Sequence, residues 1–400
     1  MRFPEEVEKV LGILHENGYA AYAVGGCVRD FLLGKTPKDY DVTTDALPDE
    51  MLKLFGGFSV IPTGIKHGTV TVLINRLPIE VTTFRTDGVY LDNRRPSSVS
   101  FSRNIGDDLK RRDFTINAIA YSPFEGYVDL FGGKEDLKNR LIRCVGDAGE
   151  RFDEDALRIL RALRLAAELE FAIENDTSRS IRSKKELLRN ISRERINVEF
   201  TRILLSSKAA ETLLSYRDVM GEFLPQAAKD PRLKEKARII GAAQDLSSRL
   251  AVLLGGTFGW RQAEGILREL KYDNTIIRDT VMLLRYKNLK VRTGKQHIKL
   301  WLKTMGASSF LRLLALKGLT EDMETQKRIS REILEQKDCY LLKNLALNGG
   351  DLLREGIREG TEIGRILNRL LMYVILEKLP NEKTALMEYT KKIILGVRFD

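Results

Sequence analysis

The chain has 400 residues, of which 43% are hydrophobic and 30% are charged, as in folded globular proteins rather than disordered ones. This length exceeds what one hydrophobic core organises and indicates two to four domains. No apolar run approaches the roughly 20 residues of a membrane span, and the three cysteines lack metal-binding spacing. We therefore expect a cytoplasmic protein with no membrane partner and no structural zinc. The formal net charge of +10 favours a polyanionic partner, nucleic acid first, and the sequence predicts no particular oligomeric state.

The first third of the chain alternates between helical and strand patterns. Its opening helix, at residues 5–17, is amphipathic and carries acidic residues, which argues against a signal or transit peptide. The elements predicted next are a strand at 19–26, a helix at 28–34, a strand at 39–44, a helix at 45–55 with Pro48 near its start, and strands at 67–75 and 78–85. After about residue 140 the strand pattern fades and amphipathic helices remain. The predicted fold class is therefore α+β, with a mixed head and a long helical part.

Two carboxylates stand two residues apart in the segment PKDYDVTT, at Asp39 and Asp41. Residues i and i+2 of a strand point to the same face, so both side chains are expected to project together. Carboxylates this close repel each other unless a cation lies between them, which makes the pair a predicted Mg²⁺ site. Glu80, on the strand at 78–85, is the candidate third acid. An exposed strand glutamate without a catalytic role is the alternative.

Upstream of these acids, VGGCVRDFLLGK places two glycines after a strand and before a helix. Amides at a helix N-terminus can hold phosphate, and Gly26 lies at that point. Arg29, one turn into the helix, can add a charge-assisted contact to a triphosphate. Together with the carboxylates, these residues predict a two-metal phosphoryl-transfer site.

The segment EDALRILRALRLAA, residues 154–167, reads as an apolar helix with one polar stripe. After the first glutamate its charged positions are three apart and share adjoining parts of one helix face. They are Asp155, Arg158, Arg161 and Arg164. A salt-bridged stripe that faces solvent is the alternative, although solvent faces are usually broader and more mixed in charge.

We interpret this stripe as the reader of a nucleobase. Asp155 would accept a hydrogen bond from the exocyclic amine of cytosine or adenine, and Arg158 would donate one to the adjacent ring nitrogen. Uracil and guanine present the opposite pattern, and each such contact discriminates by about 1–3 kcal/mol. Arg161 and Arg164 would support that pair or reach phosphate and ribose. Protein side chains would thus replace a nucleic acid template.

A run of basic residues with no acid extends from residue 280 to residue 320. Its nine members are Arg285, Lys287, Lys290, Arg292, Lys295, Lys299, Lys303, Arg312 and Lys317. Solvated helix faces usually mix charges of both signs, so we interpret the run as a surface for RNA, with a purely solvated face as the alternative. The predicted phosphate contacts are Lys290, Arg292, Lys295 and Lys299, together with backbone amides near Gly356, Gly360 and Gly364.

Taken in order, GGCVRDFLLGKTPKDYDVTT, LKRRDFTINAIA and EDALRILRALR resemble the motifs of bacterial class II tRNA nucleotidyltransferases and of their relatives, the bacterial poly(A) polymerases. Residues 191–204 and 345–371 resemble neck and tail segments of the same family, so the resemblance spans nearly the whole chain. It implies a polymerase-β-like nucleotidyltransferase head followed by all-helical neck, body and tail domains that hold tRNA. The expected boundaries are 1–140 for the head, 141–210 for the neck, 211–310 for the body and 311–400 for the tail.

The resemblance implies addition of CCA to the 3′ end of tRNA from CTP and ATP. Residue by residue, it assigns Mg²⁺ to Asp39 and Asp41, and the nucleotide phosphates to Gly26 and Arg29. It assigns the pocket for incoming CTP or ATP to Arg112, Asp155, Arg158, Arg161 and Arg164. Residues 85–88 and 92–96 resemble the flexible loop with which full CCA-adding members switch from CTP to ATP.

Three alternatives stay open on the sequence. The enzyme could add only CC or only A, and the presence of the loop argues against the CC-only form. It could be a bacterial poly(A) polymerase, although the basic terminal extensions usual in those enzymes are missing from this sequence. In a different class, it could be an RNA-binding factor with an inactive transferase head, against which the intact Asp39 and Asp41 speak.

Overall fold

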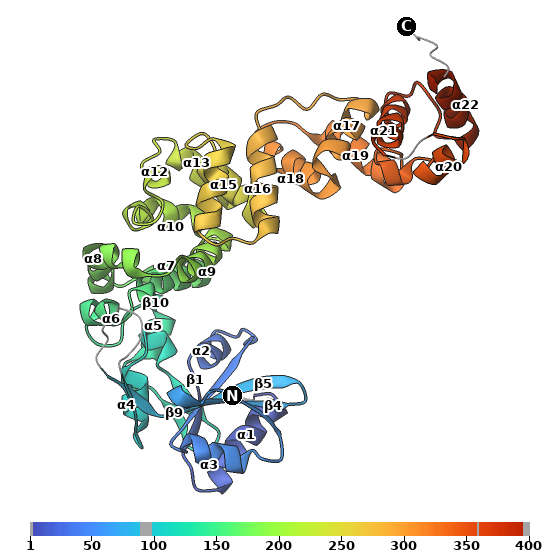
Figure 1. Cartoon of the computed structure of the whole chain (residues 1–400). Helices are drawn as coiled ribbons and strands as arrows, with labels where there is room; N and C mark the ends of the chain where they lie inside the picture. Colours follow the sequence, from blue (N-terminus) through green and yellow to red (C-terminus); the bar gives the residue numbers. More distant parts are fainter. Residues whose placement is uncertain (1–2, 89–97, 358–359, 395–400) are drawn as a thin grey trace. The chain divides into compact units, whose positions relative to one another are not determined.

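The computed structural model describes residues 3–88, 98–357 and 360–394. The chain divides into two compact units, Met1–Ala237 and Arg238–Asp400. The first unit contains the β-sheet and a set of helices, and the described part of the second is built from helices (Figure 1). Within the described residues, no helix is both long enough and apolar enough to cross a lipid bilayer.

The head is built on a seven-stranded sheet in the order β3-β4-β5-β2-β1-β8-β9. These strands are β1 Ala21–Val24, β2 Tyr40–Thr44, β3 Ser59–Gly64, β4 Thr69–Ile74, β5 Leu77–Thr83, β8 Ala120–Ser122 and β9 Gly126–Val128. Strands β2 and β5 are parallel and the other neighbours are antiparallel. The parallel register places Asp41 directly opposite Glu80. A separate ribbon pairs β6 Arg85–Asp87 with β7 Val99–Phe101.

Helices of the head follow apolar spacing in the sequence. The opening helix buries Val7, Val10, Leu11 and Leu14, the i, i+3, i+4, i+7 pattern of one helix face, and packs against β1 and β2. Pro48 takes the first position of α3, where its missing N–H leaves no hydrogen bond unmade. The helices are α1 Glu5–Glu16, α2 Gly26–Leu32, α3 Pro48–Leu54, α4 Ile105–Lys110 and α5 Gly133–Lys138, with short 3-10 turns η1 Ile65–His67 and η2 Thr115–Asn117.

The rest of the first unit consists mainly of helices. They are α6 Ala148–Glu154, α7 Leu157–Leu169, α8 Asn175–Lys184, η3 Lys185–Asn190, α9 Arg193–Leu205, α10 Ala209–Ser215, α11 Arg217–Met220 and α12 Pro225–Ala228. Helix α13, Leu233–Ala242, contains the boundary between the two units. Two strands of two residues each, β10 Leu141–Ile142 and β11 Ala172–Ile173, pair in parallel within a region expected to be all-helical. Such short pairs carry too little alternation to be recognised in a sequence.

Helices α6 and α7 correct the predicted geometry of the polar stripe. The sequence suggested one helix that included Asp155, but the chain breaks there: α6 ends at Glu154, Asp155 is extended at φ −139°, and α7 begins at Leu157. The Asp155 carboxylate accepts a hydrogen bond from the Leu157 amide, 3.1 Å away. An aspartate that accepts from a nearby backbone amide competes with helix continuation, which explains the break.

The second unit has its own cores. Its helices are α14 Leu246–Leu254, α15 Trp260–Glu269, α16 Asn274–Tyr286, α17 Lys295–Met305, α18 Ala307–Lys317, α19 Glu324–Glu335, η4 Leu342–Asn344, α20 Gly349–Arg354, α21 Thr361–Ile375 and α22 Lys383–Ile394. Near the C-terminal end, a cluster including Leu352, Leu370, Ile375 and Leu386 holds α20, α21 and α22 together. The α+β class and the helical character of the later chain are confirmed.

Candidate active site

Asp41 has two other acids near it, on interior strands of the head sheet or just before them. Asp41 lies on β2 opposite Glu80 on β5, and Asp39 directly precedes β2 rather than lying within it. Burial raises the pKa of Asp41 to about 6; the nearby Arg112 lowers it, while the charges of Glu80 and Asp39 raise it. The charges of Glu80 and Asp39 thus act on Asp41, and Asp39 is exposed immediately before the strand.

These acids suit a divalent cation that a nucleotide helps to bind. Among the described residues, no group of three or more acidic, histidine or cysteine side chains forms a complete metal site. Mg²⁺ is commonly held by one or two carboxylates, with substrate phosphates and water supplying the other ligands. Asp39 and Asp41 fit that partial donor set.

Gly25 and Gly26 form the junction between β1 and α2. Gly25 has a φ of +79°, and a Cβ atom there would lie 3.2 Å from Nη1 of Arg112 and 4.0 Å from Oδ2 of Asp41. Gly26 begins α2, and a Cβ there would lie 3.7 Å from Nη2 of Arg29. The lack of a side chain at Gly25 thus keeps space open between Asp41 and the guanidinium group of Arg112. The sequence analysis assigned phosphate binding to Gly26 alone. The pair of adjacent glycines could have indicated a role for Gly25 as well.

Two arginines flank this space. Arg29 pairs with Asp30 at 2.7 Å and donates from Nη1 to the amide oxygen of Asn117 at 2.8 Å. Arg112 donates from Nη2 to Asp108 at 2.9 Å. The Nε atom of Arg112 is buried and has no hydrogen-bond partner in the described part of the chain. An unpaired buried donor beside carboxylates suits an anionic ligand such as phosphate.

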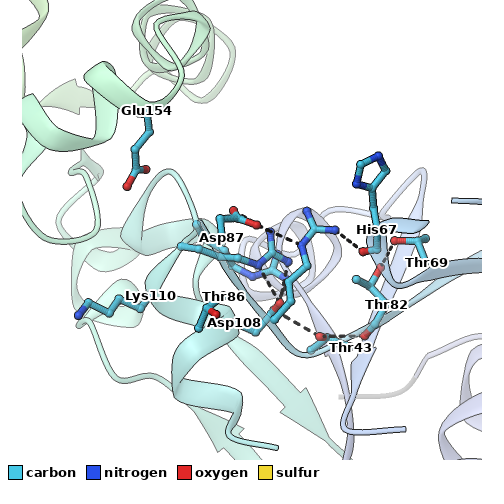
Figure 2. A network of polar contacts seen from close by, with 12 residues as sticks. Thr43, His67, Thr69, Thr82, Thr86, Asp87, Asp108, Lys110 and Glu154 are labelled. Atoms are coloured by element: carbon cyan, nitrogen blue, oxygen red, sulfur yellow. Dashed lines mark hydrogen bonds and ion pairs between the residues drawn. The ribbon is translucent and has the colours of Figure 1, made fainter. Parts of the chain in front are cut away.

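The second of these arginines forms an ion pair with Asp108, a residue labelled in the polar network of Figure 2. Asp108 is fully buried and accepts from Arg112, from Arg111 at 2.6 Å and from the Thr43 hydroxyl at 3.3 Å. Burial alone would raise the pKa of Asp108, but the two arginines hold it below its usual value. Arg111 also lies 4.0 Å from Asp87 on β6. The network therefore joins the β6 ribbon to the arginine beside Asp41.

The two predicted base-reading residues are both held by partners. Asp155 receives two hydrogen bonds from Arg195 on α9, at 2.7 and 3.2 Å. Arg158 pairs with Glu154 at 2.6 Å and donates to the backbone carbonyl of Arg111 at 3.0 Å. Arg195 was not singled out in the sequence, where no periodicity links it to a residue 40 positions away.

The remaining stripe residues have different surroundings. Arg161 donates from Nε to Asp113 at 2.8 Å, which keeps it on the side of α7 that faces the LKRRDF segment. Arg164 has a side chain only 8% exposed and pairs with Glu199 at 2.5 Å and Glu168 at 2.9 Å. Its charge is thus balanced by two carboxylates, which ties α7 to α9. A nucleotide contact by Arg164 stays a prediction.

Comparisons with known proteins match nearly the whole chain. A poly(A) polymerase head domain model matches residues 21–143, a model for the RNA and SrmB-binding site of polymerase A matches 170–229, and a tRNA nucleotidyltransferase domain 2 model matches 249–390. The chain is 36% identical to the CCA-adding enzyme of Leuconostoc mesenteroides, covering 97% of this chain and 96% of the relative, and 35% identical to that of Ligilactobacillus salivarius, covering 98% of both. The Bacillus stearothermophilus CCA-adding enzyme in complex with CTP superimposes with a TM-score of 0.81 at 30% identity, covering 98% of this chain and all of that one.

The chain belongs to the family of CCA-adding enzymes.

As a member of this family, the chain carries a candidate loop between β6 and β7. The ribbon places Arg85 against Phe101 and Asp87 against Val99. Arg85 and Asp87 are themselves joined by an ion pair at 3.5 Å. Residues 92–96, the distal part of the predicted loop, lie outside the described residues. Of the predicted loop, residues 85–88 are described, and Asp87 among them lies 4.0 Å from Arg111, beside the candidate nucleotide pocket.

In the second unit of this CCA-adding family member, acids from other segments balance part of the basic run. Lys295 and Lys299 both pair with Asp338, at 2.9 and 3.1 Å, and Lys299 is buried. Lys290 and Arg292 are exposed and form no ion pair within the described residues. The sequence concealed this difference because Asp338 lies beyond the run and reaches it only through the fold.

The predicted glycine contacts lie near the start of α21. Gly356 and Gly360 have φ angles of +82° and +109°, and Gly364 lies within the helix. A Cβ at any of the three would meet no atom within 4 Å among the described residues, and a backbone contact to RNA stays a prediction.

An arginine–aromatic cluster on α15 and α16 was not predicted. The guanidinium groups of Arg261 and Arg285 lie 4.8 and 5.6 Å from the ring centre of Trp260, and Arg285 also lies 5.4 Å from that of Tyr286. Neither arginine forms an ion pair in the part of the chain that the structure describes. Such stacked arginines keep donors available for phosphate.

Proposed function

We propose that this chain adds C, C and A to the 3′ end of tRNA, using CTP and ATP and no nucleic acid template. The observation that carries this proposal is Asp41, with Asp39 and Glu80 acting on its charge, beside Gly25 and a half-buried arginine whose buried Nε atom has no partner in the described part of the chain. Membership of the CCA-adding family supports it over the whole chain.

In the proposed reaction the 3′ hydroxyl oxygen of the RNA bonds to the α-phosphorus, the bond to the β-phosphate oxygen breaks, and pyrophosphate leaves. Asp39 and Asp41 would hold Mg²⁺, which supplies positive charge to the attacking and leaving oxygens. Glu80 is proposed as the third carboxylate of this set because it lies opposite Asp41. Gly26, Arg29 and Arg112 would bind the triphosphate, and the open space at Gly25 would let it approach the acids.

Nucleotide choice is proposed to rest on Asp155 and Arg158. Each still has hydrogen-bonding capacity for a base. A carboxylate has about four acceptor positions, of which Arg195 and the Leu157 amide use three in Asp155, and the guanidinium of Arg158 has five N–H donors. Arg161, with Asp113, would support this pair, and Arg164 would brace α7 against α9.

The RNA side of the reaction is proposed to use the second unit. Exposed Lys290 and Arg292, with the stacked Arg261 and Arg285, offer cations that are not already balanced within the described residues, and the backbone around Gly360 offers amides. The proposed compartment is the cytoplasm, where Cys27, Cys144 and Cys339 would stay reduced, as the free thiols of the structure are.

The test is an incorporation assay with tRNA transcripts that end before C74, after C74 or after C75, each given CTP, ATP or both. Full CCA addition predicts completion of all three ends with both nucleotides. Completion of only the last end would indicate an A-adding enzyme, arrest after C75 a CC-adding enzyme, and long A tracts a poly(A) polymerase. No incorporation with any end would contradict the catalytic proposal.

A further inference from the structure

One side chain in the head connects the two ends of the candidate nucleotide pocket. Asn117, the last residue of η2, is 8% exposed. Its amide oxygen accepts from Nη1 of Arg29 at 2.8 Å, and its amide nitrogen donates to Oδ1 of Asp113 at 3.1 Å. An arginine can only donate, and an ionised aspartate can only accept. The amide orientation is therefore fixed by its two partners.

The contact continues to the stripe on α7. The other oxygen of Asp113 accepts from Nε of Arg161 at 2.8 Å, while the Phe114 amide donates to the first at 2.9 Å. Burial would raise the pKa of Asp113, but Arg161 and Asn117 hold it well below its usual value, so the carboxylate stays ionised. Arg29, Asn117, Asp113 and Arg161 thus form an unbroken chain of hydrogen bonds from α2 to α7.

Asn117 also borders the space at Gly25. Its backbone oxygen lies 3.8 Å from the position that a Cβ of Gly25 would take. The side chain is uncharged and sits between a cation proposed for phosphate and an anion proposed to support base reading. A residue at this point can set the distance between the two without taking part in the chemistry.

We propose that Asn117 is a positioning residue that aligns Arg29, at the phosphate end of the pocket, with Asp113 and Arg161, at its base end. This rests on the nucleotide pocket of the proposed function. Replacing Asn117 with an apolar residue leaves Arg29 with Asp30 as its remaining partner of the two. It also removes one of the donors that hold Asp113 in place. Both ends of the nucleotide then lose alignment from a single substitution.

The experiment is a double-mutant cycle on Asn117→Ala and Arg29→Met, with KM measured for CTP and ATP on matched tRNA ends. The expected result is a rise in KM of about tenfold for Asn117→Ala, the loss of one hydrogen bond to a charged group. Arg29→Met is expected to raise KM further, and the double variant to exceed Arg29→Met by less than the tenfold effect of Asn117→Ala alone, because part of the effect of Asn117 on KM acts through Arg29.

A second readout separates positioning from general destabilisation. Asn117→Ala is expected to raise the fraction of UTP incorporated, through Asp113 and Arg161, whereas Arg29→Met is expected to leave that fraction at the wild-type value. The matched control is Asn104→Ala, which removes the amide that caps α4 by accepting from Gly106. That variant is expected to lower Tm and leave KM and UTP incorporation unchanged.

Asn117→Asp keeps the side-chain shape and the acceptor for Arg29 but offers no amide donor to Asp113. It is therefore expected to raise the UTP fraction and to change KM less than Asn117→Ala does. Wild-type KM and UTP fraction in both Asn117 variants, or additive effects in the cycle, would overturn the inference while leaving the pocket intact. An unchanged KM in Arg29→Met would instead overturn the phosphate assignment in the proposed function, and the inference with it.

Discussion

Replacing Gly25 with alanine tests whether the space between Asp41 and Arg112 is functional. At a φ of +79° a non-glycine residue carries a backbone cost of about 1–3 kcal/mol. The added methyl group would also lie 3.2 Å from Nη1 of Arg112, so the guanidinium must give way by a few tenths of an ångström. For a unit of 237 residues, about 2–4 °C of Tm is lost per kcal/mol, which predicts a fall of about 2–12 °C.

The matched control is Gly34→Ala. Gly34 also has a positive φ, +71°, but a Cβ there would meet no atom within 4 Å. Both variants are expected to melt at lower temperature, and only Gly25→Ala is expected to raise the KM for CTP and ATP, by about tenfold or more. Thermal melts and steady-state kinetics on a tRNA that ends before C74 measure both quantities. Equal KM values in the two variants, with Tm lowered in both, would refute the role of this space in nucleotide binding.

Three further outcomes are expected. Asp41→Ala should abolish addition of both C and A while tRNA still binds in a gel-shift assay, and ordinary turnover in Mg²⁺ would contradict the metal assignment. Asp155→Asn should admit UTP, and Arg158→Ala should lose discrimination along with rate; unchanged ratios among the four nucleotides in both variants would show that this helix is only structural. Lys290→Ala and Arg292→Ala should each reduce the salt slope of tRNA binding by about 0.7–0.9, whereas Lys299→Ala should mainly lower Tm because its partner Asp338 stays half-buried; equal slopes in all three would exclude RNA contacts at this surface.

Local patterns in the sequence predicted much of the fold. The apolar spacing of residues 5–17 gave α1, Pro48 marked the start of α3, and the alternating segments gave β4 and β5. The first of the sheet's outer strands, β3, was missed because SVIPTG contains a proline and a glycine, which weaken a strand pattern. The break at Asp155 was missed because helix spacing continues through it, and only the hydrogen bond to the Leu157 amide reveals the turn.

The candidate site was predictable where its residues lie within one motif, and not where contacts cross between motifs. Asp39, Asp41 and Gly26 could be chosen from short segments, and resemblance added Arg112. Arg195 and Asp338 could not be chosen, because each reaches its partner through tertiary packing across 39 or more positions. For the same reason no ion pairs could be predicted for the basic run. In the fold, Lys295 and Lys299 pair with Asp338, whereas Lys290 and Arg292 are exposed and form no ion pair within the described residues.

The partners of Asp155 and Arg158 bear on how a protein can select a base. A side chain that is free to rotate can turn away from a mismatched base and hydrogen-bond to water, so a mismatch costs little. Asp155 is held by Arg195 and by the Leu157 amide, and Arg158 by Glu154 and the Arg111 carbonyl, so both are fixed in direction. A base with the wrong pattern of donors and acceptors would then face a charged side chain that cannot turn away from it. Under this condition a polar site discriminates strongly. Under the proposed base reading, fixed partners on α6, α9 and the LKRRDF segment would serve selectivity as well as stability, and nucleotide choice would depend on three separate parts of the sequence.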